Sequence, residues 1–304
     1  MASETVRVGR RTFEVKNLDK LMFPDDGITK SDLIDYYRAI GPHMIPHVKN
    51  RLMTLERYPD GVGGPRFYSK EIPSYFPAWI DRKKVAKEGG EVTHVVANER
   101  ATLVYLANQA CITPHVGLSR IDSLDRPDQL ILDLDPSRDD FAAVRKAAHL
   151  ARALLDELGL PSFLKTTGSR GLHIVVPLDR KTSFGDVRRF AGDVAGVLAS
   201  RDPKNLTVEA RKDKRKGRLF VDWLRNSYGQ HAVAPYAVRA RPGAPVAMPV
   251  EWDELDQRGF SAQRHSIRSA TDRIDSGGDA WTGWRKKTRS LAAARRRLDE
   301  MLGA

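Results

Sequence analysis

The apolar run between positions 130 and 136 is the clearest hydrophobic pattern in the chain. It reads Leu-Ile-Leu-Asp-Leu-Asp-Pro, which predicts a buried strand that ends at a proline. Alternate side chains of a strand lie on one face. Asp133 and Asp135 therefore point the same way, while Leu132 and Leu134 point into a core. At the usual rise of a strand the two carboxylates lie about 6–7 Å apart.

Helices and further strands are predicted on both sides of this strand. Residues 141–158 carry an apolar stripe at helical spacing, and Gly159 stops it. Strands over 162–166 and 172–176 follow, joined by the loop 167–171. The other predicted elements are a hairpin over 5–15, a helix over 29–40 stopped by Gly41-Pro42, strands over 51–58 and 92–97, an exposed hairpin tip over 82–91, and helices over 101–110 and 184–198.

The segment 211–218 is strongly basic, and strand-like sequence flanks it. We therefore expect a basic hairpin with a return strand over 219–224, in which Asp222 is the only acid. Beyond it, Arg239 and Arg241 are expected on one face of a strand.

The last part of the chain differs in character from what precedes it. We expect residues 1–265 to form one domain. Residues 266–280 read as a linker, and residues 281–304 as a basic helix that packs on the domain or meets a partner.

Composition narrows the class of protein. The chain has 304 residues with 51 Lys and Arg against 39 Asp and Glu, a net charge of +12. Such an excess favours a polyanionic partner, most often nucleic acid, and the alternative is a merely solvated basic surface. The single cysteine, Cys111, excludes an internal disulfide and is expected to be a buried apolar residue. Neither a signal peptide nor a membrane-spanning run is present, so a cytoplasmic, nucleoid-associated protein is expected.

Candidate chemistry gathers around the strand at 130–136. Two carboxylates on one face repel each other unless a cation lies between them, and oxygen ligands favour Mg²⁺ or Mn²⁺. Asp222 is a candidate third ligand, the alternative being a salt bridge to an arginine. The loop 167–171 supplies glycines, hydroxyls and an arginine, as a phosphate-binding loop requires. The alternative is an Asp-x-Asp turn that only caps a helix, followed by a loop that only turns.

Four other residues are candidate contacts whose role the sequence leaves open. Phe67 and Tyr68 stand near Lys70, where they either stack on bases or pack under a loop. Lys30 is either a surface lysine or a phosphate ligand in the first turn of a helix. His115, in a loop before the strand at 130–136, is a candidate ligand contact.

Three motifs resemble those of the archaeo-eukaryotic primase superfamily. They are Asp133-Leu134-Asp135-Pro136, Thr167-Gly168-Ser169-Arg170-Gly171-Leu172-His173 and Val221-Asp222-Trp223. More narrowly, the chain from about Thr12 to Glu254 resembles the LigD-type polymerase domain of bacterial non-homologous end joining and its stand-alone primase-polymerase relatives. The features that carry this likeness are Asn17-x-x-Lys20, Lys30, Phe67-Tyr68 and Ala234-Pro235-Tyr236-x-x-Arg239. The chain departs from the family pattern at Glu56, Thr167, Arg170 and Arg225.

The resemblance implies an α+β fold, a primase-polymerase core of central, mostly antiparallel sheets with an RRM-like element, flanked by helices. It implies a template-directed nucleotidyltransferase that fills short gaps and extends ends in break or excision repair, preferring ribonucleotides and using two Mn²⁺ or Mg²⁺ ions. Implied partners are DNA with a gap or break carrying a 5′-phosphate, NTP or dNTP, a separate DNA ligase and the end-binding protein Ku, with no membrane.

The resemblance also implies roles for individual residues. Asp133, Asp135 and Asp222 would be catalytic and hold the metals. The nucleotide would contact Thr167, Gly168, Ser169, Arg170, His173, Arg239 and His115. The 5′-phosphate would contact Asn17, Lys20 and Lys30, the template would stack on Phe67 and Tyr68, and DNA would contact Arg57, Lys212, Lys214, Arg215 and Lys216.

Two other functions fit part of the sequence. An Asp-nucleophile phosphatase also opens with Asp-x-Asp after an apolar strand, but it gives the basic segment 211–218 no role. A DNA-binding repair scaffold without catalysis predicts salt-dependent DNA binding and no nucleotide incorporation.

Overall fold

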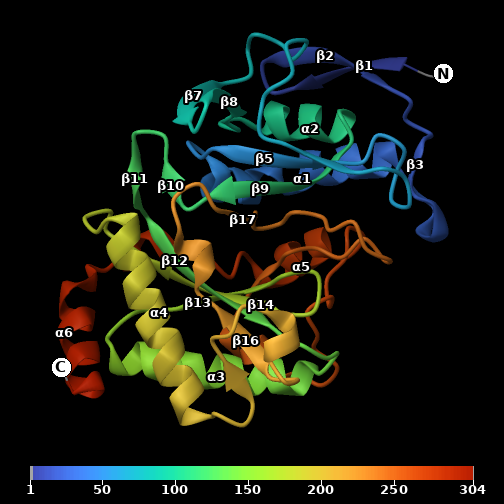
Figure 1. The fold of residues 1–304 in the computed structure, drawn as a ribbon. Helices are drawn as coiled ribbons and strands as arrows, with labels where there is room; N and C mark the ends of the chain where they lie inside the picture. Colours follow the sequence, from blue (N-terminus) through green and yellow to red (C-terminus); the bar gives the residue numbers. More distant parts are fainter. Residues whose placement is uncertain (1–2, 304) are drawn as a thin grey trace. The chain divides into compact units, whose positions relative to one another are not determined.

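The computed structural model describes residues 3–303, and the chain divides into two compact units (Figure 1). Unit 1 comprises Met1–Gly117, His231–Met248 and His265–Gly278. Unit 2 comprises Leu118–Gln230, Pro249–Arg264 and Asp279–Ala304. Both units combine sheets with helices, so the predicted α+β class with mostly antiparallel sheets is confirmed.

Unit 2 is built on a six-stranded sheet. Its strands, in spatial order, are β15 (Leu206–Thr207), β16 (Leu219–Asp222), β12 (Gln129–Asp135), β14 (Leu172–Pro177), β13 (Phe163–Thr166) and β18 (Pro249–Val250). Every neighbouring pair is antiparallel except β15 with β16. As predicted, Leu132 and Leu134 of the central strand β12 are fully buried.

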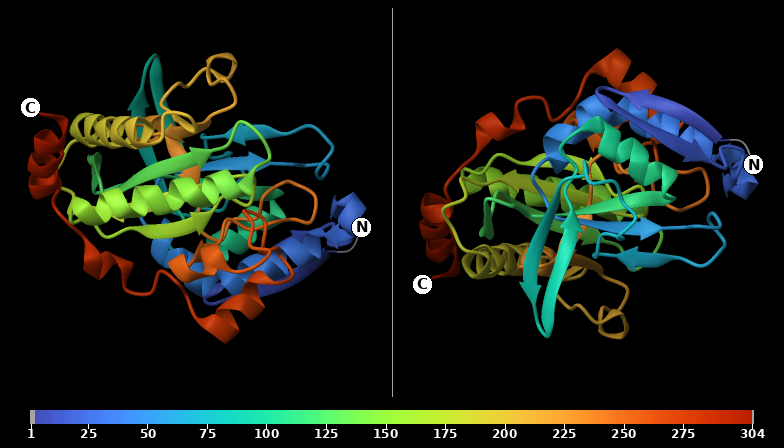
Figure 2. Two further views of the ribbon diagram at one scale, coloured as in Figure 1. Left: turned by 90° about the horizontal axis from the view of Figure 1, so that it is seen from below. Right: turned by 90° about the horizontal axis from the view of Figure 1, so that it is seen from above.

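Helices cover this sheet, and a hairpin precedes it. The helices are α3 (Phe141–Glu157), α4 (Phe184–Arg201) and α6 (Leu291–Leu302), and the hairpin is β10 (Ser119–Arg120) with β11 (Ser123–Pro127). Helices α3 and α4 pack against each other and against β12, and α6 packs on α4, as the two views of Figure 2 show. Burying Leu291, Ala294 and Leu298 fixes α6 in place.

Unit 1 is built on a four-stranded antiparallel sheet. Its order is β17 (His231–Val233), β9 (Cys111–Gly117), β5 (Met53–Arg57) and β6 (Phe67–Ser69). Three hairpins accompany it: β1 (Ser3–Val8) with β2 (Arg11–Lys16), β3 (Leu21–Phe23) with β4 (Ile28–Thr29), and β7 (Arg82–Lys87) with β8 (Gly90–Val95). Its helices are α1 (Lys30–Val48), α2 (Arg100–Asn108) and α5 (Ala270–Gly277).

The predicted end of α1 at Gly41-Pro42 is wrong, because the helix continues to Val48 through Pro42 and Pro46. Gly41 serves packing and does not stop the helix. A Cβ at this position would lie 2.5 Å from Cγ of Arg100, so only glycine lets α2 come this close. The second half of α1 buries Met44 and Val48, and this burial offsets the cost of the two prolines.

Three further predictions need correction. The segment 211–218 is not a hairpin, because β15 and β16 run parallel, and the strand after it ends at Asp222. Residues 235–243 form no strand. They make one isolated bridge, Val238 to Val246, near a positive φ of 66° at Tyr236. The segment 266–280 contains the helix α5, and the last helix begins only at Leu291.

Two smaller expectations concern burial. Cys111 is a free, buried cysteine on β9, and burial raises the pKa of its thiol to about 12, as befits an unreactive apolar residue. Within residues 3–303 we find no helix with the length and apolar character needed to cross a membrane.

Candidate active site

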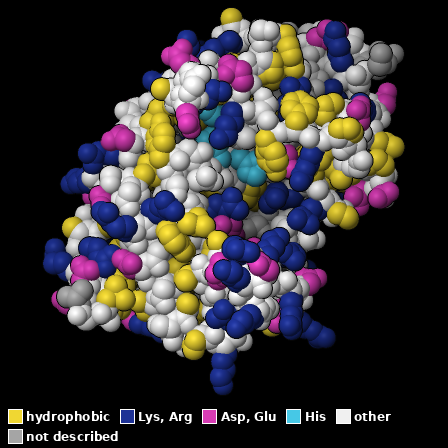
Figure 3. Space-filling view, in the orientation of Figure 1, with side chains coloured by type: hydrophobic (Ala, Val, Ile, Leu, Met, Phe, Trp, Pro, Cys, Tyr) yellow, Lys and Arg dark blue, Asp and Glu magenta, His cyan; other side chains and the backbone are white. Residues whose placement is uncertain are grey.

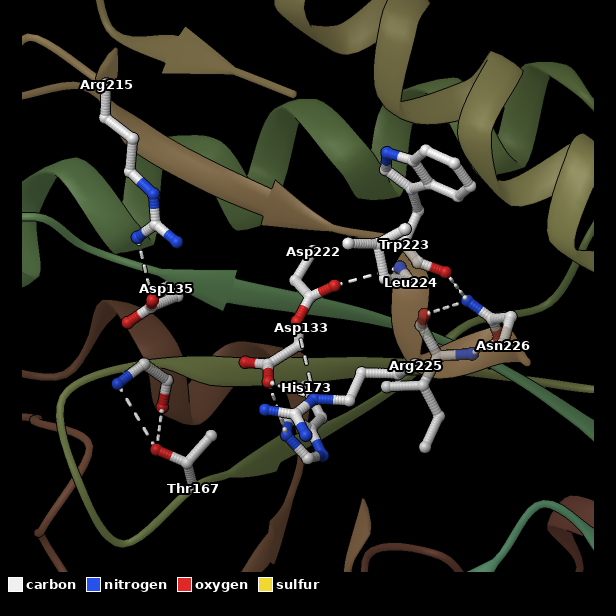
Figure 4. A network of polar contacts seen from close by, with 12 residues as sticks. Asp133, Asp135, Thr167, His173, Arg215, Asp222, Trp223, Leu224, Arg225 and Asn226 are labelled. Carbon is white, nitrogen blue, oxygen red and sulfur yellow. Dashed lines mark hydrogen bonds and ion pairs between the residues drawn. The ribbon is translucent and has the colours of Figure 1, made fainter. Parts of the chain in front are cut away.

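A row of polar residues crosses the unit 2 sheet at β12. Asp133 pairs directly with Asp222 of β16 on one side and with His173 of β14 on the other (Figure 4). Directly opposed side chains in antiparallel strands lie on one face with their Cβ atoms about 4.5–5.5 Å apart. Asp135 follows two positions later on the same face. The sheet therefore brings His173 and Asp222, which are distant in the sequence, to the two acids of β12.

Arginines partner each of these carboxylates. Nε of Arg225 lies 3.3 Å from Oδ2 of Asp133 and 3.4 Å from Oδ2 of Asp222. Nη1 of Arg215 lies 2.9 Å from Oδ2 of Asp135. The cluster of acids is thus embedded in positive charge, as a site that binds phosphate groups requires.

The electrostatics of the row differ from one residue to the next. Burial raises the pKa of Asp222, and the neighbouring Asp133 carboxylate raises it further. Against the effect of burial, His173 and Arg225 hold the pKa of Asp133 well below its usual range. Burial and then the charge of Lys165 lower the pKa of His173 to about 4, so its imidazole is neutral near physiological pH. Asp133 therefore stays ionised while Asp222 resists ionisation beside it.

Lys165 is a member of the row that sequence reasoning missed. It lies on β13 directly opposite His173 and is only 1% exposed. A buried lysine is rare unless an acid or other acceptor is near. The available signal was a lysine inside an otherwise apolar strand, Phe163-Leu164-Lys165.

The loop 167–171 is organised by a single hydroxyl. Oγ1 of Thr167 donates to the carbonyl of Gly171 at 2.9 Å and accepts from the N–H groups of Ser169 and Gly171, both at 3.2 Å. Gly171 is required where it stands, because a Cβ there would lie 2.0 Å from the carbonyl oxygen of Leu134. The loop is thereby held tightly beside the end of β12, and Nη2 of Arg170 lies 3.7 Å from Oδ1 of Asp135.

The basic segment 211–218 contains residues of two kinds. Arg215 is buried: it contacts Asp135, donates to the carbonyls of Glu209 and Ala210, and stacks 4.5 Å over the ring of Phe220. Lys212, Lys214 and Lys216 are exposed. Lys and Arg side chains are widespread on the face drawn in Figure 3, with acids among them, so positive charge alone does not distinguish this segment.

Unit 1 gathers the residues expected to hold a 5′-phosphate. The backbone N–H of Lys20 bonds to the carbonyl of Asn17 at 3.1 Å, and that of Lys30 bonds to the carbonyl of Lys20 at 2.8 Å. Lys30 is largely buried, and its Nζ donates to the carbonyl of Lys16 at 2.9 Å. Burial, together with the charges of Lys20 and Arg57, lowers the pKa of Lys30 to about 8. Several cations forced together in this way favour an anionic ligand.

The two aromatic residues expected to stack on a template are consecutive residues of the strand β6. Phe67 is 43% exposed and Tyr68 56% exposed, so neither is a core residue. The guanidinium of Arg57 lies 5.3 Å from the Phe67 ring centre and donates to the carbonyl of Gln109 at 2.8 Å. Arg57 thus supports the ring from behind.

Two of the expected nucleotide contacts lie in unit 1. His115 is on the strand β9, so its predicted position in a loop is wrong, and its Nε2 lies 3.3 Å from Oε2 of Glu56. Arg239 follows the bridge residue Val238, and its N–H bonds to the carbonyl of Pro245 at 2.7 Å. The remaining expected nucleotide contacts, in the loop 167–171 and at His173, belong to unit 2.

The carboxylates suit a hard divalent cation by their chemistry. Asp133 and Asp222 lie close enough that the charge of Asp133 raises the pKa of Asp222. Closely spaced carboxylates that offer only oxygen ligands are typical of Mg²⁺ or Mn²⁺ sites. Across residues 3–303, however, no three His, Cys, Asp or Glu side chains converge on one point, and Asp135 is turned towards Arg215. Binding one ion with all three acids would require Asp135 to leave that arginine.

Comparison with known proteins identifies the family of the chain. The family model described as "LigD, primase-polymerase domain" matches residues 29–281. Over 266 residues the chain is 34% identical to the multifunctional non-homologous end joining protein LigD of Mycolicibacterium smegmatis, covering 86% of this chain and 35% of that protein. The LigD of Pseudomonas aeruginosa is 32% identical over 299 residues, covering 97% of this chain and 35% of that protein. The chain thus spans about a third of the length of these relatives.

A solved structure supports the same assignment. The polymerase domain from Mycobacterium tuberculosis ligase D, in complex with DNA, superposes with a TM-score of 0.85 at 32% identity, covering 90% of this chain and 98% of that one. The match spans nearly the whole of both chains. The chain belongs to the LigD primase-polymerase domain family, a family of DNA-directed nucleotidyltransferases.

Proposed function

We propose that this chain fills short gaps and extends ends in DNA break repair by template-directed nucleotidyl transfer. The observation that carries the proposal is the cross-strand row in which Asp133 lies between Asp222 and His173. Acids on adjacent strands, with cations around them, suit a reaction in which negative charge moves between phosphate groups. The match to a polymerase domain solved with DNA supports this assignment.

Asp133, Asp135 and Asp222 would hold two divalent ions, Mg²⁺ or Mn²⁺. When bound, the ions supply Lewis-acid chemistry that lowers the pKa of the primer 3′-hydroxyl and neutralises the leaving pyrophosphate. The chain's own contribution is positioning. Arg225 and Arg215 already contact these acids, and they are placed to balance the charge of the acids when no ion is present.

We assign the triphosphate to the loop beside β12. Arg170 would supply a cation there. The backbone of Gly168 and Ser169 would face the phosphates, in a turn held by the hydrogen bond from the Ser169 N–H to the Thr167 hydroxyl. The neutral imidazole of His173 borders the same acids. In unit 1 we assign nucleotide contacts to His115 and Arg239, and we expect ribonucleotides to be preferred.

Contacts with DNA are assigned to four groups of residues. The crowded cations of Lys20 and Lys30, with Asn17, would bind a 5′-phosphate at a gap or break. The exposed rings of Phe67 and Tyr68 would stack on template bases. Lys212, Lys214 and Lys216 would contact the phosphate backbone, whereas Arg57 and Arg215 would act chiefly by holding Phe67 and Asp135. The end-binding protein Ku and a DNA ligase are the proposed partners, at the nucleoid.

The test is primer extension across a short gap that carries a 5′-phosphate, with Mn²⁺ and with either ribonucleotides or deoxyribonucleotides. We expect incorporation that follows the template and is faster with ribonucleotides. DNA binding without incorporation of either nucleotide would instead identify a non-catalytic repair scaffold. Equal incorporation of both nucleotides would retain the polymerase and reject the sugar preference.

A further inference from the structure

Unit 1 contains a buried carboxylate that the proposed reaction does not use. Glu56 lies on β5, and its side chain is only 5% exposed. An ionised carboxylate in such a place is costly unless each oxygen has hydrogen-bond donors. An acid is also unexpected beside residues assigned to anionic ligands.

Several donors satisfy this carboxylate, and Tyr68 is among them. Oε1 of Glu56 accepts from the hydroxyl of Tyr58 at 2.8 Å and from Nη1 of Arg66 at 3.2 Å. Oε2 lies 3.3 Å from Nε2 of His115. Although burial raises it, hydrogen bonds from His115 and Tyr58 lower the pKa of Glu56 to about 2. The carboxylate is therefore ionised throughout the physiological range.

This ionised state fixes the form of the histidine. A carboxylate only accepts hydrogen bonds, so the contact requires a proton on Nε2 of His115. A negative charge at this distance also favours the doubly protonated, cationic imidazole. Glu56 thus makes His115 a better partner for an anion than a histidine without such a neighbour.

The same carboxylate lies behind the exposed Tyr68. Glu56 and Tyr68 are direct cross-strand partners on β5 and β6. The Tyr68 ring meets the His115 ring edge to face, with centres 5.9 Å apart, and the Arg66 guanidinium lies 5.9 Å from the Tyr68 ring centre. One buried acid therefore connects two residues to which we assign substrate contacts.

We propose that Glu56 is a positioning residue, which holds His115 as a proton donor and Tyr68 edge-on to it, and so sets the affinity of this face for a nucleoside triphosphate. This inference rests on the proposed roles of His115 and Tyr68. Glu56 itself touches neither nucleotide nor template in this account.

Glu56 favours protonation of His115, and the other groups around His115 either oppose this effect or do not change it. Arg66 competes with His115 for the carboxylate, and its side chain is 60% exposed, which weakens its influence through solvent screening. His231 on β17 is neutral, because burial lowers its pKa to about 3. The pKa of Tyr68 is raised by burial and by Glu56, so Tyr68 stays neutral too. Among these groups Glu56 is the one anion, so we expect its removal to lower the pKa of His115.

The direct test is an NMR titration of ¹⁵N-labelled histidine in the protein without nucleotide. The His115 signals are assigned with His115→Gln. We expect Glu56→Gln to lower the pKa of His115 by about one unit, the lower end of the effect of a nearby opposite charge. Glu91→Gln, which removes an exposed acid paired with Lys84 in the same unit, should leave the His115 titration unchanged. An equal His115 pKa in wild type and Glu56→Gln overturns the proposal.

A second variant keeps the test decisive if Glu56→Gln does not fold. Arg66→Gln removes the competing cation at an exposed position, and we expect it to raise the pKa of His115. A lower or unchanged pKa in this variant contradicts the network.

The consequence for substrate binding is tested by splitting KM from kcat. We expect Glu56→Gln to raise KM for the nucleotide about tenfold above neutral pH, with kcat within about twofold, because one pKa unit is a tenfold change in protonation. The difference should shrink as the pH is lowered, because His115 becomes protonated in both proteins at sufficiently acidic pH. A KM that is the same in both proteins at every pH overturns the substrate role. If wild-type protein incorporates no nucleotide but the NMR coupling persists, the proposed function fails while the link between Glu56 and His115 stands.

Discussion

Asp133 and Asp222 are direct cross-strand partners on β12 and β16, and Nε of Arg225 lies within 3.4 Å of an oxygen of each. Burial, and then the charge of Asp133, raise the pKa of Asp222, so ionising the second acid of this pair is costly. Keeping the two acids on neighbouring strands reduces the stability of the fold and creates a site for cations.

Replacing Asp222 by Asn should therefore separate stability from function. Like charges directly opposed across strands cost up to about 1 kcal/mol, and Asn retains an oxygen that can accept from the N–H of Leu224. We expect the free energy of unfolding of Asp222→Asn, measured by urea with a chelator present, to equal or exceed that of wild type. Nucleotide incorporation should be lost in the same protein. A variant that is both less stable and active would contradict this reading.

Gly171 is where the loop meets the core strand most closely. A Cβ there would lie 2.0 Å from the carbonyl oxygen of Leu134, so Gly171→Ala must push the loop away from β12. We expect a loss of about 1–3 kcal/mol in the free energy of unfolding and a weakened nucleotide affinity. Gly196→Ala is the matched control: it lies within α4, with no atom within 4 Å of the added Cβ. It should be neutral or stabilising by up to about 1 kcal/mol.

Lys30 predicts a pH dependence of 5′-phosphate recognition. Its pKa of about 8 in the folded protein lies below the ordinary lysine value of 10.5, so Lys30 loses its proton at lower pH in the folded protein than in the unfolded chain. Affinity for a gap with a 5′-phosphate, divided by affinity for the same gap without it, should fall as pH rises through about 8. Stability has the opposite sign: since the unfolded chain binds more protons between about pH 8 and about pH 10.5, unfolding should become less favourable over that window. A phosphate preference that stays level to about pH 9.5 would reject Lys30 as the ligand.

The segment 211–218 predicts two kinds of variant. Arg215→Ala removes a buried cation from Asp135 and should cost about 3 kcal/mol of stability, at the low end for breaking a buried pair because Asp135 is partly exposed. Lys214→Ala should leave the stability unchanged and reduce the slope of log affinity for DNA against log salt by about one. Equal effects of both variants on stability would contradict the distinction between the buried arginine and the exposed lysine.

The sequence predicts local elements and the acidic strand well. The burial of Leu132 and Leu134 and the shared face of Asp133 and Asp135 follow from alternation alone, and the structure agrees with both. The sequence does not predict the register in which the strands pair. Which residue of β16 or β14 faces Asp133 depends on long-range pairing, so the place of Lys165 in the row was not accessible.

The errors have physical causes as well. Gly41 looked like a helix stop, but its function is to admit the Arg100 side chain, and local sequence cannot show a contact between two helices. The parallel pairing of β15 with β16 involves only two residues of each strand, and so weak a signal leaves a basic segment between strand-like sequences with the pattern of a hairpin. The contact of Glu56 with His115 joins β5 to β9, and the sequence around Glu56 does not predict it.

The central claim is that the Asp133 row is a polymerase active site, and single-turnover extension of a 5′-phosphorylated gap tests it most directly. Wild type is compared with Asp133→Asn, after circular dichroism and DNA binding show that the variant is folded and still binds. Loss of a group that only supports a metal ligand typically reduces activity by about 10–100-fold. We predict that Asp133→Asn reduces the rate of incorporation by more than this. Incorporation by the folded variant at the wild-type rate would contradict the account.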